Sequence, residues 1–368
     1  MGVECQGAVY PSTASWFLFF YHKYKGDMVM KMVPVQEAVG MVLCHDITQI
    51  IPGKFKGRAF KKGHIVKFED IPRLLDLGKQ NLYVWEINKD LLHEDDAALR
   101  IARAAAGHGI TLTEPKEGKV NLVAKEKGLL KVNSDALYSI NELEDVMFAT
   151  LHTNQIVEKD KVLAGTRIIP LVIKDDKIRN IENICRINYP LIEVKPFRSL
   201  KVGVVTTGSE VYHGRIQDEF GPVVTKKIAS WGSYVFRQIF VSDSTEMIVN
   251  AINQLLREGA EMITATGGMS VDPDDLTPAG IRAAGGRIVT YGAPTLPGAM
   301  FMVAYMGKVP VLGLPGCVMY SRSSIFDLVV PRILAGEEIT RRDIVALGHG
   351  GLCVNCKECR YPDCGFGK

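Results

Sequence analysis

Glu261-Met-Ile-Thr-Ala-Thr266-Gly-Gly-Met-Ser270-Val-Asp-Pro-Asp-Asp275 is the segment from which the architecture of this chain can be worked out. Its first six residues predict a buried strand, and the two glycines that follow predict a tight turn at the end of this strand. Glycine lets backbone N–H groups approach an anion closely. The three carboxylates beside the turn would repel an anion unless a divalent cation lies between them. The segment therefore predicts a phosphorylated or oxyanionic ligand that is bound jointly by backbone groups and Mg²⁺.

Strands and helices alternate on both sides of this segment, from residue 200 to residue 336. Strands are expected at 201–208, 234–241, 261–266, 287–291 and 309–316, and helices at 218–231, 244–256, 277–284 and 317–334. This alternation is typical of an α/β domain with three layers and a mostly parallel sheet.

Ligands of such domains bind at the carboxyl ends of the strands. The turns at Thr207-Gly208-Ser209-Glu210 and Leu314-Pro315-Gly316 follow two further strands. We expect both turns to lie beside Gly267 at one edge of the sheet. The helix expected at 317–334 would add the positive end of its dipole to this edge.

Two smaller modules are expected before residue 200. Residues 28–92 combine short strands, glycine turns and one helix at 69–78, which is typical of a small mixed, β-rich module. Residues 93–195 predict an α+β module with helices at 97–106 and 135–151 and a hairpin over 119–133. Within this module, Asp95-Asp96 is expected to cap the first helix, and residues 190–196 are expected to form a linker.

The composition restricts the class of protein. The 368 residues include 44 basic and 41 acidic side chains, a net charge of +3, and this balance gives no reason to expect a nucleic-acid partner. No apolar run reaches the roughly 20 residues of a membrane helix. No positively charged segment precedes the apolar run at 16–21, so a secretory signal is not expected. Residues 1–27 are interpreted as a leader outside the fold, either an upstream start-site artefact or a loosely packed segment.

Four cysteines are bunched in the tail over residues 345–368, at Cys353, Cys356, Cys359 and Cys364. In a chain without a secretory signal, this bunching is typical of a metal or redox site in a reducing compartment, and it favours a cytoplasmic location. The C-x2-C-x2-C-x4-C spacing can enclose either Zn²⁺ or a [4Fe–4S] cluster. The alternative is an exposed, redox-active thiol tail without metal.

The block over about 200–336 resembles the molybdopterin-binding domain of molybdenum cofactor biosynthesis proteins. Four motifs carry the resemblance: Thr207-Gly-Ser-Glu-Val211, Gly214-Arg-Ile-Gln-Asp218, the 266–275 segment and Gly313-Leu-Pro-Gly316. The preceding region, about 30–195, is similar more loosely to the other domains of molybdopterin molybdenumtransferases. The resemblance implies an enzyme that uses Mg²⁺, takes adenylylated molybdopterin and molybdate, and releases AMP. It also implies a homodimer.

The resemblance implies roles for particular residues. The phosphate side of the pterin would be contacted by Thr266, Gly267, Gly268 and Ser270. Asp275 falls on the family's acidic position, a catalytic or metal-binding carboxylate. Residues 272–274 depart from the family pattern, and the extra carboxylate of Asp274 is expected either to act with Asp275 in catalysis and with Asp272 and Asp275 in binding Mg²⁺, or only to form a turn. The rest of the ligand cleft would be formed by Thr207, Gly208, Ser209, Glu210, Asp218, Pro315 and Gly316.

This chain departs from the family pattern in several places. Cys317 and Phe220 stand where relatives usually have Asn, and residues 297–300 lack a lysine that is typical of the insertase branch. The β-rich C-terminal domain of the insertases is not expected in the residues after Gly336. These departures leave two alternatives open. One is a non-catalytic carrier or sensor that delivers molybdopterin to a molybdoenzyme client, and the weaker one is a nucleotide pyrophosphatase. The choice between molybdenum and tungsten also stays open.

Overall fold

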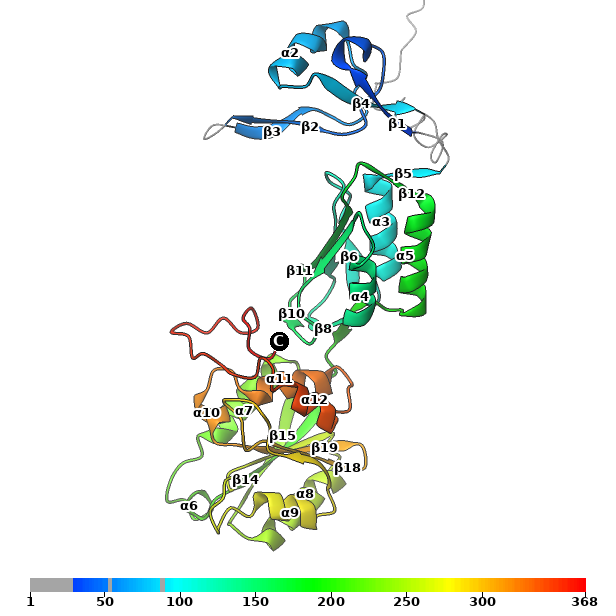
Figure 1. Ribbon diagram of the computed structural model, residues 1–368. Coiled ribbons are helices and arrows are strands. Elements are labelled where there is room, and N and C mark those ends of the chain that lie inside the picture. The colour runs from blue at the N-terminus through cyan, green and yellow to red at the C-terminus, as the bar shows by residue number, and fades with distance from the viewer. Residues whose placement is uncertain (1–28, 52–54, 87–89) are drawn as a thin grey trace, which may run out of the picture.

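The computed structural model describes residues 29–51, 55–86 and 90–368 (Figure 1). The leader expected at 1–27 lies outside the described residues. Figure 1 shows three bodies in succession: an N-terminal module (29–86), a middle module (90–196) and an α/β domain (200–346), with the cysteine-rich tail (347–368) lying between the last two. In the described part of the chain, no helix combines the length and apolar character that a membrane span requires.

The N-terminal module is built from two antiparallel strand pairs and a short helix. β1 (Val29–Pro34) pairs with β4 (Asn81–Glu86), and β2 (Ile47–Ile51) pairs with β3 (Phe55–Phe60). The helical segments are η1 (Val35–Glu37), η2 (Phe68–Asp70) and α2 (Ile71–Asp76). A small core that includes the fully buried Leu43 and Leu74 holds these elements together.

The middle module packs three helices against small antiparallel sheets. The helices are α3 (Glu94–Ala105), α4 (Ser134–Asn141) and α5 (Asp175–Ile187). One sheet has the order β6 (Ile110–Leu112), β7 (Val120–Ala124), β11 (Val162–Ile168), β9 (Val146–Thr150). A second sheet has the order β10 (Ile156–Val157), β8 (Gly128–Val132), β13 (Ile192–Pro196), and β5 (Leu91–His93) pairs with β12 (Val172–Lys174).

Several expectations for this module are wrong. The hairpin over 119–133 does not form, because β7 and β8 pair within different sheets. The helix expected at 135–151 ends at Asn141, whose side-chain amide exchanges two 2.8 Å hydrogen bonds with the backbone of Phe148 and so starts β9. The expected linker at 190–196 contains β13, which is paired with β8. The N-cap of α3 is His93, which accepts a hydrogen bond from the backbone N–H of Asp95.

The α/β domain has a six-stranded sheet with helices on both faces. The order is β15 (Tyr234–Val241), β14 (Lys201–Thr207), β16 (Met262–Thr266), β19 (Val309–Leu314), β18 (Met302–Met306), β17 (Arg287–Tyr291). The first four strands are parallel, and the last two pairings are antiparallel. This arrangement confirms the expected α/β class with a mostly parallel sheet.

Two apolar cores lie on the two faces of this sheet. One face is covered by α8 (Thr245–Arg257) and α9 (Thr277–Ala283), and the other by α7 (Phe220–Ser230), α11 (Ile325–Leu334) and α12 (Arg341–Ala346). Figure 1 shows these two helical layers on opposite sides of the strands. Ser244 caps α8 by accepting a hydrogen bond from the N–H of Met247, as expected.

The single helix expected at 317–334 is wrong. The chain forms α10 (Cys317–Tyr320), becomes extended, and starts α11 at Ile325. Ser324 and Asp327 form a capping box there, and this box fixes a new helix start. The antiparallel strand β18 was not expected, because its apolar run 301–306 lacks the alternation with helices on which the assignment depended.

Candidate functional site

Three turns meet at the carboxyl edge of the α/β sheet, which we call the rim. Thr206 is in register with Thr266, and Thr266 is in register with Leu314. Because β14, β16 and β19 are parallel neighbours, the turns that follow these strands lie side by side. The second turn touches the first, since a Cβ atom at Gly267 would lie 2.3 Å from the carbonyl oxygen of Thr207. Gly267 also has φ +87°, so only glycine fits there without strain.

Threonine hydroxyls hold the first two turns together. Thr207 Oγ1 donates to the carbonyl oxygen of Thr266 (3.1 Å), and Thr277 Oγ1 donates to that of Gly267 (2.8 Å). The two hydroxyl oxygens also lie 3.1 Å apart. Two hydroxyl protons serve these three contacts, so both protons are committed inside the protein. Thr207 and Thr266, both predicted to contact the ligand, therefore act here mainly as buried connectors.

A second network starts from Asp218. Its carboxylate accepts from the N–H groups of Phe220 and Gly221 at 3.0–3.1 Å, which caps the start of α7. It also accepts from Gln238 Nε2 (2.5 Å), and the same amide nitrogen donates to Thr206 Oγ1 (2.8 Å). Asp218 is thus engaged on several sides in holding the wall behind the rim.

The first turn is tied to the end of β15. Gly208 has φ +141°, and the backbone N–H of Ser209 donates to Asp243 Oδ2 (2.8 Å). Ser209 Oγ lies 2.8 Å from Ser242 Oγ. Glu210 is exposed, and its carboxylate bends back over Gly208. Of the two acidic positions predicted beside this turn, Glu210 is therefore the more open to a ligand.

The acidic loop after Gly268 is largely open to solvent. Asp272 and Asp274 are exposed, and Asp275 is half-buried. Asp275 Oδ2 accepts from the N–H of Asp272 (3.1 Å), which folds the loop into a turn. The hydroxyl of Tyr291 lies within reach of the carbonyl oxygens of Met269 (2.9 Å) and Ser270 (3.1 Å) and fastens the loop to β17. Burial, and secondarily the charge of Asp275, raise the pKa of Tyr291, so it stays a donor.

The third turn contributes Pro315 and Gly316. Pro315 is buried, whereas Gly316 is exposed and no atom would lie within 4 Å of an added Cβ. The helix that follows has only four residues, so the expected contribution of a long helix dipole is lost. Burial raises the pKa of Cys317, which therefore stays a neutral thiol at this position.

The residues predicted for the ligand cleft thus come together at the rim, but they divide into two kinds. The exposed or half-buried ones are Ser209, Glu210, Gly267, Gly268, Ser270, Asp272, Asp274, Asp275 and Gly316, while Thr207, Gly208, Thr266 and Pro315 are buried. Asp218 is half-buried, but its carboxylate is occupied by hydrogen bonds within the protein. Sequence reasoning missed the supporting residues Thr206, Gln238, Thr277 and Tyr291. Thr206 and Tyr291 lie at strand ends and Thr277 at a helix start, whereas Gln238 lies in the middle of β15 and gave no signal.

The tail cysteines line one cavity of about 540 Å³ together with residues 320–323. The tail is fixed to both neighbouring bodies. The hydroxyl of Tyr361 donates to the carbonyl oxygen of Asp327 (2.7 Å), and Asp363 pairs with Lys161 of the middle module (2.6 Å). In the described part of the chain, no three His, Cys, Asp or Glu side chains are arranged to hold an ion. The magnesium site and the tail metal site therefore stay predictions.

The comparisons with known proteins bear mainly on the α/β domain. Residues 203–335 match a family model described as "Probable molybdopterin binding domain". Residues 32–86 match a model described only as a domain of unknown function.

Individual relatives match over part of their length. A molybdopterin adenylyltransferase from Pyrococcus furiosus is 24% identical over 95 residues, which is 26% of this chain and 56% of that protein. A CinA-like protein from Mycobacterium sp. (strain MCS) is 33% identical over 89 residues, 24% of this chain and 21% of that protein. This chain thus spans about half of the first relative and about a fifth of the second. The solved structure of the molybdopterin biosynthesis enzyme MoaB from Thermus thermophilus aligns with 21% identity and a TM-score of 0.32, over 38% of this chain and 98% of that chain.

The family match covers most of β14, all of β15, β16 and β19, and the turns of the rim. Residues 203–335, which make up most of the α/β domain, are therefore similar to the molybdopterin-binding domain that this family model describes.

Proposed function

We propose that this chain binds molybdopterin at the rim and catalyses the Mg²⁺-dependent insertion of molybdate into adenylylated molybdopterin, with release of AMP. The observation that carries the proposal is the contact between the first two turns. Gly267 lies against Thr207, and the largely exposed loop 270–275 follows the second turn directly. An anionic ligand seated on the glycines would therefore face Asp272, Asp274 and Asp275.

The donor set of this loop suits Mg²⁺. Mg²⁺ prefers hard oxygen ligands and usually binds to one or two carboxylates together with substrate phosphates. Asp272 and Asp274 are exposed, and Asp275 uses only Oδ2 in its hydrogen bond to the backbone. When bound there, Mg²⁺ would supply electrostatic stabilisation of the phosphoanhydride that is cleaved.

Backbone groups and side chains of the rim would bind and orient the ligand. The backbone of Gly267 and Gly268 can approach a phosphate closely, because neither residue has a Cβ atom. Tyr291 holds the carbonyl groups of Met269 and Ser270, so the acidic loop keeps its position when the ligand binds. Ser209 and Glu210 would close the cleft from the side of β14.

The test is the release of AMP from adenylylated molybdopterin in the presence of molybdate and Mg²⁺. Replacing Asp275 by Asn keeps an oxygen that can accept from the N–H of Asp272, so the loop is retained while the charge is lost. We expect Asp275→Asn to lower the rate at least a hundredfold, or about 3 kcal/mol in the barrier. Asp160→Asn, at an exposed position in the middle module, is the matched control and should keep the full rate. Equal rates in all three proteins would refute the assignment.

A carrier or sensor of molybdopterin is the second candidate. It is favoured by the bond between Asp275 and the backbone of Asp272, since this carboxylate already has a structural task. A carrier would bind molybdopterin with the same rim but release no AMP under any condition of the assay. A nucleotide pyrophosphatase would instead release a mononucleotide from a dinucleotide substrate without molybdate. The same assay therefore separates all three functions.

For the tail we propose a bound metal, either Zn²⁺ or a [4Fe–4S] cluster. The supporting observation is that Cys353, Cys356, Cys359 and Cys364 all line one cavity. Metal analysis of anaerobically purified protein should give about one zinc per chain, or iron and sulfide with a brown colour. The double variant Cys356→Ser/Cys359→Ser should lose this metal, and the control Cys317→Ser should keep it. Metal-free wild-type protein, or unchanged metal in the double variant, would contradict the proposal.

A further inference from the structure

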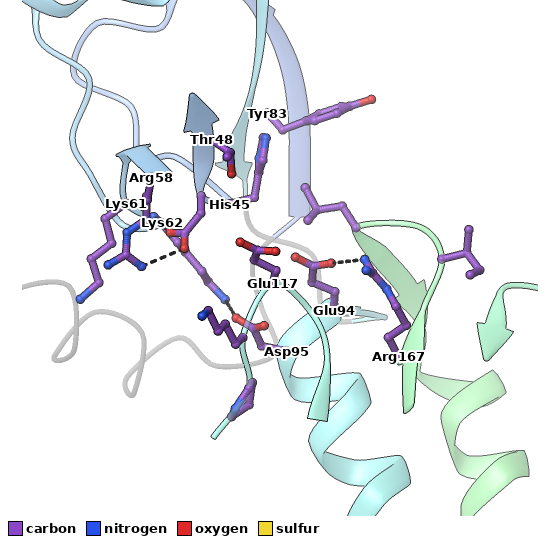
Figure 2. Close-up of a pocket in the computed structure, with 15 residues that line it drawn as sticks. His45, Thr48, Arg58, Lys61, Lys62, Tyr83, Glu94, Asp95, Glu117 and Arg167 are labelled. Carbon is purple, nitrogen blue, oxygen red and sulfur yellow. Dashed lines mark hydrogen bonds and ion pairs between the residues drawn. The ribbon is translucent and has the colours of Figure 1, made fainter. Parts of the chain in front are cut away.

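A second cavity lies far along the chain from the rim, where the N-terminal module meets the middle module. This junction pocket has a volume of about 550 Å³, within the range of small-molecule sites. It is lined by His45, Asp46, Thr48, Arg58, Lys61, Lys62 and Tyr83 from the first module, and by Glu94, Asp95, Pro115, Lys116, Glu117, Arg167, Ile169 and Leu171 from the second. Figure 2 shows Lys62 of the first module pointing toward Asp95 of the second, with Glu94, Glu117 and Arg167 beside them.

A buried network joins the two walls. Lys62 Nζ pairs with Asp95 Oδ2 (2.7 Å) and lies 2.9 Å from His93 Nδ1. His93 Nε2 lies 2.8 Å from the carbonyl oxygen of Cys44, so this nitrogen carries the proton and Nδ1 accepts. Burial, reinforced by the charge of Lys62, lowers the pKa of His93 to about 4. The imidazole is therefore neutral at pH 7, and it connects the modules at the edge of the pocket.

The floor of the pocket contains a buried carboxyl group. Glu94 is 8% exposed, and its nearest charged partner is Arg167 at 3.5 Å. A Cβ atom on Gly118 would lie 2.1 Å from Glu94 Oε2, so the glycine makes room for this side chain. Burial raises the pKa of Glu94, and the charge of Asp95 acts in the same direction. A buried carboxyl group with one long ion pair still has acceptor capacity that a donor group of a ligand can satisfy.

His45 adds an unsatisfied group to the same cavity. Its Nδ1 atom is buried and has no hydrogen-bond partner among residues 29–51, 55–86 and 90–368. Burial lowers the pKa of His45, so the ring is neutral and can either donate or accept. A buried polar atom without a partner costs about 1–3 kcal/mol, and a ligand in the pocket can recover part of this energy.

The junction pocket is lined by five basic side chains and four acidic ones, and among the described residues the acidic Glu117 has no ion-pair partner. Arg58, Lys62 and Arg167 each face a carboxylate within 3.5 Å. Among the described residues, the ammonium groups of Lys61 and Lys116 have no such partner, although both line the pocket. Acceptors at the floor and free cations elsewhere in the lining match a molecule that carries hydrogen-bond donors at one end and an anion at the other.

We propose that the junction pocket is a second ligand site, separate from the rim, and that it binds a small phosphate ester bearing hydroxyl or amino groups. The phosphate lies against Lys61 and Lys116. The hydroxyl or amino groups face Glu94 and His45. The proposal does not rest on the function proposed for the α/β domain, because the two sites share no residue.

The test is calorimetric titration of the full chain with ribose 5-phosphate and glucosamine 6-phosphate as probes. Inorganic phosphate and citrate serve as comparison probes, the first without hydroxyl or amino groups on a carbon skeleton and the second without phosphate. We expect saturable binding of at least one ester, with an affinity at least tenfold higher than that of either comparison probe. The variant Lys61→Ala/Lys116→Ala should weaken this binding at least tenfold. The control Lys125→Ala/Lys159→Ala removes two exposed lysines elsewhere on the middle module and should leave it unchanged.

A third variant tests the floor of the pocket. Glu94→Gln keeps the shape of the side chain and one acceptor oxygen but can no longer take a charge. We expect it to weaken binding of the ester while leaving the weak binding of inorganic phosphate unchanged. The proposal is overturned if no ester binds more tightly than inorganic phosphate, or if the two double-lysine variants bind the ester equally well. Molybdopterin binding is unaffected by any of these variants if both proposals hold.

Discussion

The rim of the α/β sheet and the junction pocket both present polar groups, but they are held together by different interactions. The rim is held by backbone groups and threonine hydroxyls, with Gly267 pressed against Thr207. The junction pocket is held by ionisable groups, with the network of Lys62, His93 and Asp95 at its edge. The first arrangement depends on close packing and the second on protonation. Steric changes should therefore disturb the rim most, and changes of pH should disturb the junction most.

The replacement Gly267→Ala should have the greatest effect on stability. Its Cβ atom would lie 2.3 Å from the carbonyl oxygen of Thr207, and φ is +87°. We expect a loss of about 3 kcal/mol in the free energy of unfolding, because a steric clash and a left-handed backbone act together. Urea unfolding followed by circular dichroism measures this loss.

Gly316→Ala is the matched control in the neighbouring turn. Its φ is −54°, and no atom lies within 4 Å of the added Cβ. We expect the free energy of unfolding to change by less than about 1 kcal/mol. A slight rise is consistent with this expectation, because alanine makes the unfolded chain less flexible than glycine does. If the two variants were equally stable, the close contact between the turns would be contradicted.

Acid should loosen the junction before it affects the rim. The pKa of His93 in the folded chain is about 4, below its ordinary value of 6.5. The folded state therefore favours the neutral ring, and the stability that this provides is complete above pH 6.5 and is lost as the pH falls toward 4. The difference corresponds to about 3 kcal/mol. Glu94 offsets part of this loss, because its raised pKa lets it become neutral as the pH falls.

Hydrogen exchange of the backbone amides at pH 7 and pH 4.5, corrected for the intrinsic exchange rate at each pH, measures how far acid loosens the junction. Protection of the backbone amides of Leu43 and Gly63, which lie beside the network, should fall. Protection of the amides of β14 and β16 should persist. His93→Gln keeps a donor and an acceptor but does not titrate, so its protection should depend much less on pH. An equal loss of protection at the junction and at the rim would contradict the expectation that acid disturbs the junction first.

Tyr291→Phe should have the smallest of these effects. It removes the hydroxyl that bonds the carbonyl oxygens of Met269 and Ser270. We expect a loss of about 1 kcal/mol in the free energy of unfolding, the usual contribution of one hydrogen bond. Exchange of the loop 268–276 should become faster. Tyr320→Phe, at a position that is 79% exposed, is the control and should behave like the wild type.

The regular part of the fold was accessible from the sequence because local patterns there agree with the tertiary structure. Tyr234–Val241 and Arg287–Tyr291 are apolar runs bounded by turn residues, and both strands have the predicted limits. The middle module was harder, because β7 and β8 are consecutive strands that pair with distant partners. Neighbouring strands usually pair, and nothing in the residues 125–127 between them signals the exception.

For the rim, the sequence predicted the glycines and carboxylates but not their supports. A turn such as Thr266-Gly267-Gly268 is recognisable because it needs left-handed backbone conformations. Thr277 and Gln238 are ordinary polar residues, and only the fold brings them to Gly267 and Asp218. The junction pocket could not be predicted for the same reason. The sequence of residues 93–95 predicts only an acidic helix N-terminus. Lys62, which forms the ion pair with Asp95, belongs to the N-terminal module.

Calorimetric titration of molybdopterin into the Gly316→Phe variant addresses the proposed rim site itself. Gly316 is exposed at the rim and has free space around it, so a phenyl ring can occupy the proposed ligand space without disturbing the fold. Lys308→Phe, in the turn between β18 and β19 at the opposite edge of the sheet, is the control. We expect the wild type and Lys308→Phe to bind one molybdopterin per chain and Gly316→Phe to bind at least tenfold more weakly. Equal affinity in all three proteins, or no binding by the wild type, would contradict the account.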